Sequence, residues 1–382
     1  MEGEGVSESH RMKAFKIPLL FLSVIGSNPA KVKKDAYTRF IIGFFTVVQF
    51  HNTVLLVTMI CMSLNNMDDL GEIMTCVAGM YQIIVKYIIT VINRKDIYKN
   101  VVLLLQYFPA GELEKLVTPL YIYMNKGLKF FAVLLGCCFS LYVLKPLLYF
   151  EKMLPVIWYT KHCPLESNHC YVYHYILQIF GATLMFFNII GFDGFTLAVI
   201  TVAYCELEKI KISLSDMKDD ANKTDDENMR KITELVKKHC IVLNFIKNIN
   251  NEFSTILMHQ LAATLTGVCT GIYFLMLFQN DLGVVLRFVP YLLSILVQMF
   301  LYSVAGELIA TQTQSIHFAA YDTNWHLKHQ PKTTKALCMM MLRSQKPDEI
   351  IAGMWTWNMR IFLSLLQTGF SMFTFMKTVQ SK

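Results

Sequence analysis

A long uncharged stretch constrains this chain more than any other feature. Between Phe40 and Met67 the sequence contains no Asp, Glu, Lys or Arg, and about 20 apolar residues are enough to cross the ~30 Å hydrocarbon layer of a membrane. The whole chain has a matching composition, because 54% of its 382 residues are hydrophobic and only 16% are charged. A soluble protein carries about 25% charged residues. The sequence therefore predicts an all-α membrane protein.

Hydropathy predicts seven membrane-spanning helices. An acidic N-terminal segment with a short apolar core at 17–26 precedes them, and we expect an interfacial helix there rather than a cleaved signal peptide. The predicted spans are 40–64, 71–92, 128–150, 171–204, 253–278, 284–309 and 350–379. These spans divide the chain into an N-terminal segment 1–39, spans one to four in 40–204, polar helices in 205–252, spans five and six in 253–309, a polar helical segment in 310–349, and the last span with the C-terminus in 350–382.

Lysine and arginine residues are distributed unevenly between the connections. The N-terminal segment and the connections after the second, fourth and sixth spans carry most of them, whereas the longest loop on the other side has only Lys152 and Lys161. Because basic connections stay in the cytosol, we expect a cytosolic N-terminus and an extracellular C-terminus. Receptors that couple to G proteins have the opposite orientation, and the D-R-Y and N-P-x-x-Y patterns typical of them are absent from this sequence.

The predicted outer loop contains the sequence HCPLESNHC, with Cys163 and Cys170. A disulfide between them is chemically permitted outside the cell, but the sequence does not give the geometry that the bond needs. His162 and His169 lie beside these cysteines, yet the spacing does not match the usual C-x2-C zinc pattern. We therefore expect no metal and leave the disulfide open.

Motifs of catalysis are absent. The sequence has no G-x-x-x-x-G-K-[ST], H-E-x-x-H or G-x-S-x-G motif, and no basic run interleaved with aromatics that would suggest nucleic acid as a partner. Two ionisable residues fall inside spans: we expect Lys86 to extend towards the membrane surface and Asp193 to make a buried hydrogen bond or a close packing contact. We expect neither an enzyme nor a cofactor.

Aromatic and methionine side chains gather on the outer halves of several spans. If they face one another, they form an apolar pocket for a small lipophilic ligand, although helix packing or an interfacial aromatic belt accounts for such residues equally well. The candidates are Cys76, Met80, Tyr81, Phe139, Tyr142, Tyr149, Tyr175, Gln178, Met185, Phe288 and Tyr291.

Motifs along most of the chain resemble those of the insect odorant receptor family. The match is strongest near the C-terminus, where Ala352-Gly353 and the sequence GFSMFT follow a basic segment, and the sequences YHYILQIFG, GFDGF and YSVAGELIATQTQSI match the family's fourth and sixth spans. The T-Y-x5-Q-F ending of the sister gustatory receptors is absent. Residues of the basic segment that carry the match are Tyr321, Trp325, Lys335, Leu337, Arg343 and Pro347.

The resemblance implies a ligand-gated cation channel rather than an enzyme. It implies a hetero-tetramer with the odorant receptor co-receptor (Orco) in the plasma membrane of olfactory neuron dendrites, with a small volatile odorant bound in the outer halves of the spans. It also implies a subunit anchor at Tyr321, Trp325, Lys335, Leu337, Met341, Arg343 and Pro347, where Leu337, Met340 and Met341 form one apolar stripe. The last span would line the pore, with a hydrophobic gate at Phe375 and Val379.

Three alternatives remain open from the sequence. A metabotropic seven-helix chemoreceptor would have an external N-terminus. A transporter would show inverted repeats, and none is visible. A gustatory-type receptor channel would share the topology.

Overall fold

The computed structural model describes residues 4–29, 35–63, 67–107, 113–144, 146, 154–155, 167–218, 224–278, 280, 282–327 and 329–380. Nearly all of these residues are helical, so the prediction of an all-α architecture is confirmed apart from one short hairpin. The elements are α1 (Glu4–Val24), α2 (Ala36–Ser63), α3 (Met67–Tyr107), α4 (Glu114–Val143), α6 (Asn168–Ser215), α7 (Asp225–Leu277), α8 (Leu282–Tyr321), η1 (Trp325–Leu327), α9 (Pro331–Ser344), β1 (Ile351–Ala352), β2 (Trp355–Thr356) and α10 (Met359–Gln380).

Six helices of the described part of the chain, α2, α3, α4, α6, α7 and α8, are long and apolar enough to cross a membrane. They correspond to the first six predicted spans. The seventh predicted span, 350–379, starts too early, because Gly353 has a φ of +61° and forms the turn of the β1–β2 hairpin instead. Only after this hairpin does α10 begin, and its passage through the membrane stays a prediction.

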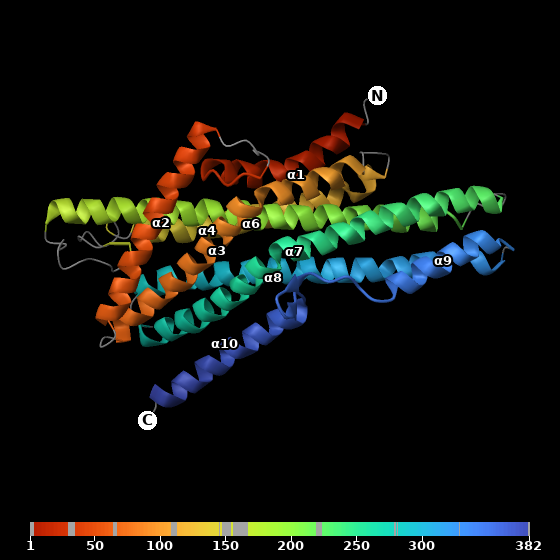
Figure 1. Cartoon of the computed structure of the whole chain (residues 1–382). Coiled ribbons are helices and arrows are strands. Elements are labelled where there is room, and N and C mark those ends of the chain that lie inside the picture. The colour runs from red at the N-terminus through yellow and green to blue at the C-terminus, as the bar shows by residue number, and fades with distance from the viewer. Residues whose placement is uncertain are drawn as a thin grey trace.

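Long helices give the molecule two distinct ends (Figure 1). The polar helices predicted at 205–252 are not separate elements, because α6 continues to Ser215 and α7 already begins at Asp225. Thr224 starts α7 with a capping box, since its side chain accepts from the backbone N–H of Glu227 while the Glu227 carboxylate accepts from the backbone N–H of Thr224. We call the end with α9 and the α6–α7 connection the α9 end, and the end with the α2–α3 connection and the start of α6 the pocket end.

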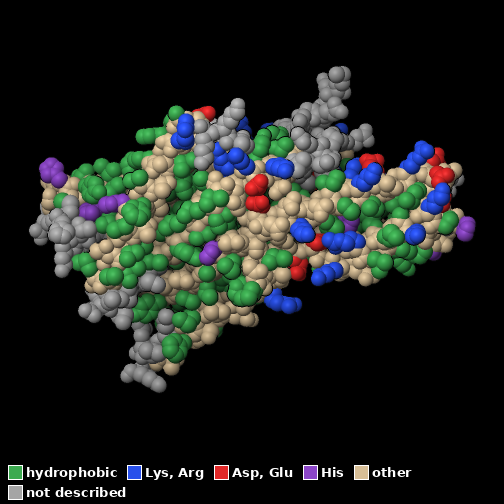
Figure 2. All heavy atoms as spheres, in the orientation of Figure 1, with side chains coloured by type: hydrophobic (Ala, Val, Ile, Leu, Met, Phe, Trp, Pro, Cys, Tyr) green, Lys and Arg blue, Asp and Glu red, His purple; other side chains and the backbone are tan. Residues whose placement is uncertain are grey.

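Charge follows the same division. In Figure 2 the Lys, Arg, Asp and Glu side chains gather on the α9 half of the visible face and along its upper edge near the start of α2, while the pocket end shows mainly hydrophobic side chains and histidines. This is the distribution expected when one end meets water and the other is surrounded by lipid.

The N-terminal helix α1 is packed into the protein on one face. Ala14 and Leu22 are fully buried, whereas Leu20 is 61% exposed. The buried face fits closely against α6 because Gly191 has no side chain. A Cβ atom at that position would come within 2.9 Å of the Leu22 side chain. This face lies against α4 and α6, and the interfacial position of α1 stays a prediction.

Candidate functional site

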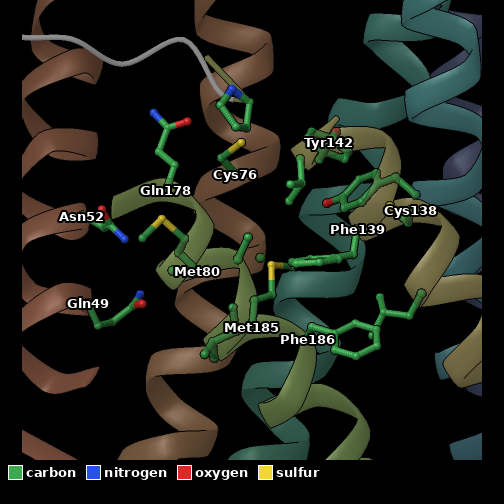
Figure 3. A pocket seen from close by; sticks show the side chains of 18 residues that line it. Gln49, Asn52, Cys76, Met80, Cys138, Phe139, Tyr142, Gln178, Met185 and Phe186 are labelled. Atoms are coloured by element: carbon green, nitrogen blue, oxygen red, sulfur yellow. The ribbon is translucent and has the colours of Figure 1, made fainter. Parts of the chain in front are cut away.

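A cavity of about 140 Å³ lies at the pocket end, between α2, α3, α4, α6 and α8. Figure 3 shows its side chains converging from several helices. Its wall is formed by Gln49, Asn52, Cys76, Gly79, Met80, Ile83, Leu135, Cys138, Phe139, Tyr142, Val143, Pro155, Gln178, Gly181, Ala182, Met185, Phe186 and Tyr291.

Most of the residues predicted for the pocket lie around this cavity. They come from α3, α4, α6 and α8, and therefore from segments far apart in the sequence. Tyr149 lies outside the described residues. The predicted residues that line the cavity are Cys76, Met80, Phe139, Tyr142, Gln178, Met185 and Tyr291; their role in binding stays a prediction.

Three predicted pocket residues face elsewhere. Tyr81 is 41% exposed and contacts His259 on α7, because the helical turn of about 100° per residue points it away from its neighbour Met80. Tyr175 donates a hydrogen bond to a backbone carbonyl at the end of α4, at 2.8 Å. Phe288 is fully buried and stacks on Phe274, with ring centroids 4.8 Å apart. The last two hold helices together.

The sequence prediction missed the contribution of α2. Gln49 and Asn52 line the cavity, and their spacing of three places both on one helical face. The same wall depends on Gly181 of α6, since a Cβ atom there would collide with the Nδ2 atom of Asn52. The sequence signal for this wall was a pair of polar residues, three positions apart, within the uncharged run.

The rest of the wall is aromatic and sulfur-bearing. The rings of Phe139 and Phe186 lie 5.4 Å apart in a tilted arrangement, and Met185 comes between them and α3, where a Cβ atom at Gly79 would lie 2.9 Å from its Cε. Such walls bind apolar ligands by burial and adapt to their shape because methionine is flexible.

A buried polar cluster lies one helical turn from the cavity. Ile83 lines the cavity, and Lys86 follows three residues later on the same face of α3. The Nζ atom of Lys86 lies 2.6 Å from Asp193 Oδ1, and both side chains are 1% exposed. Tyr302 donates to the same oxygen at 2.8 Å, and Gln298 donates to Oδ2. The prediction of a buried hydrogen bond at Asp193 is confirmed, whereas the expected extension of Lys86 to the membrane surface is wrong because Asp193 supplies a counter-charge inside the protein.

The cluster leads directly to the start of α10. The Tyr302 ring lies 5.3 Å from the ring of Trp357, which is 1% exposed. Gly306, one turn further along α8, faces the backbone carbonyl of Trp357 so closely that a Cβ atom would collide with it. Asn358 then caps α10 by accepting from the backbone N–H of Ile361 at 3.1 Å. The base of α10 is therefore held against α8.

The predicted anchor segment folds against its own chain. Leu337 and Met341 are 1% and 8% exposed, because α9 packs on α7 and α8. The apolar stripe is therefore covered by the same chain, and the role of this segment as a subunit anchor stays a prediction. The opposite face carries Met339 and Leu342, which are 60% and 66% exposed. Among the other predicted anchor residues, Tyr321, Lys335 and Arg343 are exposed, and Trp325 and Pro347 are half-buried.

The predicted gate residues both belong to α10. Phe375 is 64% exposed, and the side chain of Val379 is not among those described. In the first turn of α6, Cys170 is disulfide-bonded, while Cys163 lies outside the described residues, so their pairing stays a prediction. In the part of the chain that is described, no three His, Cys, Asp or Glu residues come together as a metal site.

Comparison with models of protein families identifies the family of this chain. The family model described as 7tm Odorant receptor matches residues 66–370. The chain belongs to the odorant receptor family. Membership agrees with the resemblance seen in the sequence and decides against a gustatory-type receptor.

Individual relatives are distant. Odorant receptor 82a of Drosophila melanogaster is 27% identical over 150 residues, 39% of each chain. Odorant receptor 30a of the same species is 24% identical over 252 residues, 65% of each chain. The matches to the first relatives cover about two-fifths of their length.

Solved structures show the fold. The olfactory receptor OR5 from Machilis hrabei in complex with eugenol superposes with a TM-score of 0.86 at 15% identity, covering 97% of this chain and 99% of that one. The structure of the same receptor described without eugenol gives a TM-score of 0.79 at 18% identity. This odorant receptor is therefore a helical membrane protein with the architecture of those structures.

Proposed function

We propose that this odorant receptor is the odorant-binding subunit of a ligand-gated cation channel, assembled as a hetero-tetramer with the co-receptor in the dendritic membrane of olfactory neurons. The observation that carries the proposal is the apolar cavity at the pocket end, joined through a buried polar cluster to the base of α10. A small volatile molecule binds there mainly by burial, at about 25 cal/mol per Å² of apolar surface.

Coupling to a pore follows from the contacts below the cavity. A ligand that separates α3 from α6 acts on Lys86 and Asp193, which lie one turn and two turns beyond the cavity lining on these helices. Asp193 holds Tyr302, and Tyr302 packs on Trp357 at the base of α10. A ligand that fits the open arrangement better than the closed one shifts the equilibrium between them.

The exposure of α10 supports its role as pore helix. Leu363, Phe370 and Phe375 are 54%, 68% and 64% exposed, although they are large and apolar. A helix that contacts its own chain on one face, against α7 and α8, leaves the others to neighbouring subunits and to a central pore. A gate at Phe375 and Val379 would close by excluding water.

The proposal is tested by expressing the chain with and without the co-receptor and recording current during an odorant panel. Odorant-evoked cation current that needs both chains is the expected result. Ala182→Phe, which fills the cavity, should abolish it, whereas Val172→Phe on the exposed side of the same helix should leave it intact.

Two outcomes would contradict the proposal. A current that survives Ala182→Phe unchanged removes the cavity from the mechanism. An epitope at the N-terminus that is accessible on intact cells contradicts the cytosolic N-terminus and favours a metabotropic receptor.

A further inference from the structure

The α2 side of the cavity contains an unsatisfied hydrogen-bond acceptor. Asn52 is 1% exposed and lines the cavity. Its Nδ2 atom donates to the backbone carbonyl of Leu177 at 3.5 Å, and its Oδ1 atom has no partner. A buried acceptor without a partner is unfavourable, so this oxygen gains most from a donor that enters the cavity.

A glycine on the neighbouring helix leaves room for the Asn52 carboxamide. Gly181 stands opposite it on α6, and any larger residue there would collide with its Nδ2 atom. The contact between α2 and α6 is thus built around an amide group where two apolar side chains would pack without an unsatisfied atom.

The same face of α2 also carries an unsatisfied donor. The Nε2 atom of Gln49, one turn earlier on the same face of α2, is buried and has no partner. Figure 3 shows the carboxamides of Gln49 and Asn52 on one side of the cavity, opposite Phe139 and Phe186. A hydroxyl group donates and accepts through one oxygen atom, so a single hydroxyl complements both amides.

We propose that Gln49 and Asn52 form a polar subsite that selects small alcohols, with the hydroxyl directed at α2 and the hydrocarbon part against α4 and α6. The inference rests on the proposed role of the cavity in odorant binding and adds the chemical class of ligand.

The volume of the cavity and the lack of charged residues in its described lining narrow the class of ligand further. The volume of about 140 Å³ is close to that of an engineered 150 Å³ cavity that holds benzene, so the hydrocarbon part is about one ring in size. Sulfur atoms of Met80 and Met185 favour contact with an aromatic edge. The described lining residues include no Lys, Arg, Asp or Glu, so a carboxylate or an ammonium group would be buried without a counter-ion. Compact ring-bearing alcohols fit, and acids and amines do not.

Direct binding to the purified full chain tests the subsite without requiring a current. The probes are benzyl alcohol, benzyl methyl ether and ethylbenzene, which share the ring and differ in hydrogen bonding; the readout is the concentration dependence of thermal stabilisation. We expect the alcohol to bind about tenfold more tightly than the other two.

Two variants and one control assign the preference to Asn52. Asn52→Leu should lower affinity for benzyl alcohol about tenfold and leave ethylbenzene unchanged or tighter. Gly181→Ala, which displaces the amide, should have the same selective effect. Asn188→Leu is the matched control, because Asn188 is on α6, is also 1% exposed and does not line the cavity; it should preserve the preference.

The remaining outcomes overturn the inference. Equal affinity for the three probes, no saturable binding by any, or an unchanged preference in Asn52→Leu and Gly181→Ala each contradict an alcohol subsite. Selective binding without an evoked current in cells that express the co-receptor leaves the subsite standing and counts against the proposed channel function instead.

Discussion

The two ends of the receptor differ in how completely they are packed. At the pocket end, five helices enclose a cavity, and glycines at 79 and 181 admit neighbouring side chains. At the α9 end, Ile232, Ile316 and Leu337 are at most 1% exposed, and Lys209 pairs with both Glu114 and Glu206.

This difference indicates where the molecule can change shape. Side chains around a void lack contacts on one side, so the helices that line the cavity can shift at low cost. A close-packed region transmits displacement rather than absorbing it. We infer that ligand binding deforms the pocket end against a fixed α9 end, with the Lys86–Asp193 pair at the boundary.

The largest effect is expected when one charge is removed at that boundary. Lys86→Met leaves the Asp193 carboxylate buried without its partner, and breaking a buried pair costs about 3–5 kcal/mol. The free energy of unfolding in mixed micelles should fall by that amount. Lys95→Met, at an exposed position of the same helix, should change it little.

The double variant Lys86→Met with Asp193→Leu separates charge from packing. It should recover much of the lost stability, because neither charge remains buried. If Lys86→Met alone unfolds as the wild type does, the pair does not hold the boundary together.

The second test compares the two faces of α9. Leu337→Ala removes a side chain that is 1% exposed and should lower the free energy of unfolding by about 3 kcal/mol. Leu342→Ala, at a residue that is 66% exposed, should stay within about 0.5 kcal/mol. Chemical denaturation of the isolated chain measures both.

The variants Leu337→Ala and Leu342→Ala also test whether α9 is a subunit anchor. If the exposed face of α9 binds a neighbouring subunit, Leu342→Ala should reduce recovery of the co-receptor complex without destabilising the chain. Equal loss of stability in the two variants would show that the burial difference does not govern α9.

Local sequence patterns predicted most of the fold. Long apolar runs located six helices, because hydropathy needs no knowledge of distant contacts. The hairpin at Ile351–Thr356 was missed, since a turn of the backbone at Gly353 decides it. The apolar stripe with Leu337 was recognised, but a periodic pattern does not say whether its partner is the same chain or another one.

The site was harder to predict because it depends on pairs far apart in the sequence. Asp193 is the partner of Lys86 at a separation of 107 residues, and Asn52 meets Leu177 at a separation of 125. Composition identified aromatic and methionine residues as pocket candidates, yet it did not separate Met80, which lines the cavity, from its neighbour Tyr81, which does not.

A third test concerns the attachment of α10 at the boundary. Gly306→Ala places a methyl group against the backbone carbonyl of Trp357, and overpacking costs about 1–3 kcal/mol. Thermal unfolding should show this loss, and odorant-evoked current should fall because the base of α10 moves. Gly43→Ala on α2 meets nothing within 4 Å and should be neutral or stabilise its helix by up to about 1 kcal/mol. A normal current in Gly306→Ala would detach α10 from the proposed coupling path.

The smallest expected effect lies farthest from the cavity. Thr224→Ala removes the capping box of α7 and should cost about 1 kcal/mol, seen as faster amide hydrogen exchange in the first turn of α7. Thr233→Ala is the control, because its hydroxyl bonds only to the carbonyl of Met229 within the same helix. Probe binding in the cavity should be unchanged in both variants, since a frayed end of α7 leaves the close-packed helices beneath it in place. If Thr224→Ala weakened binding of benzyl alcohol as Asn52→Leu is expected to do, the α9 end would not be the fixed part of this receptor.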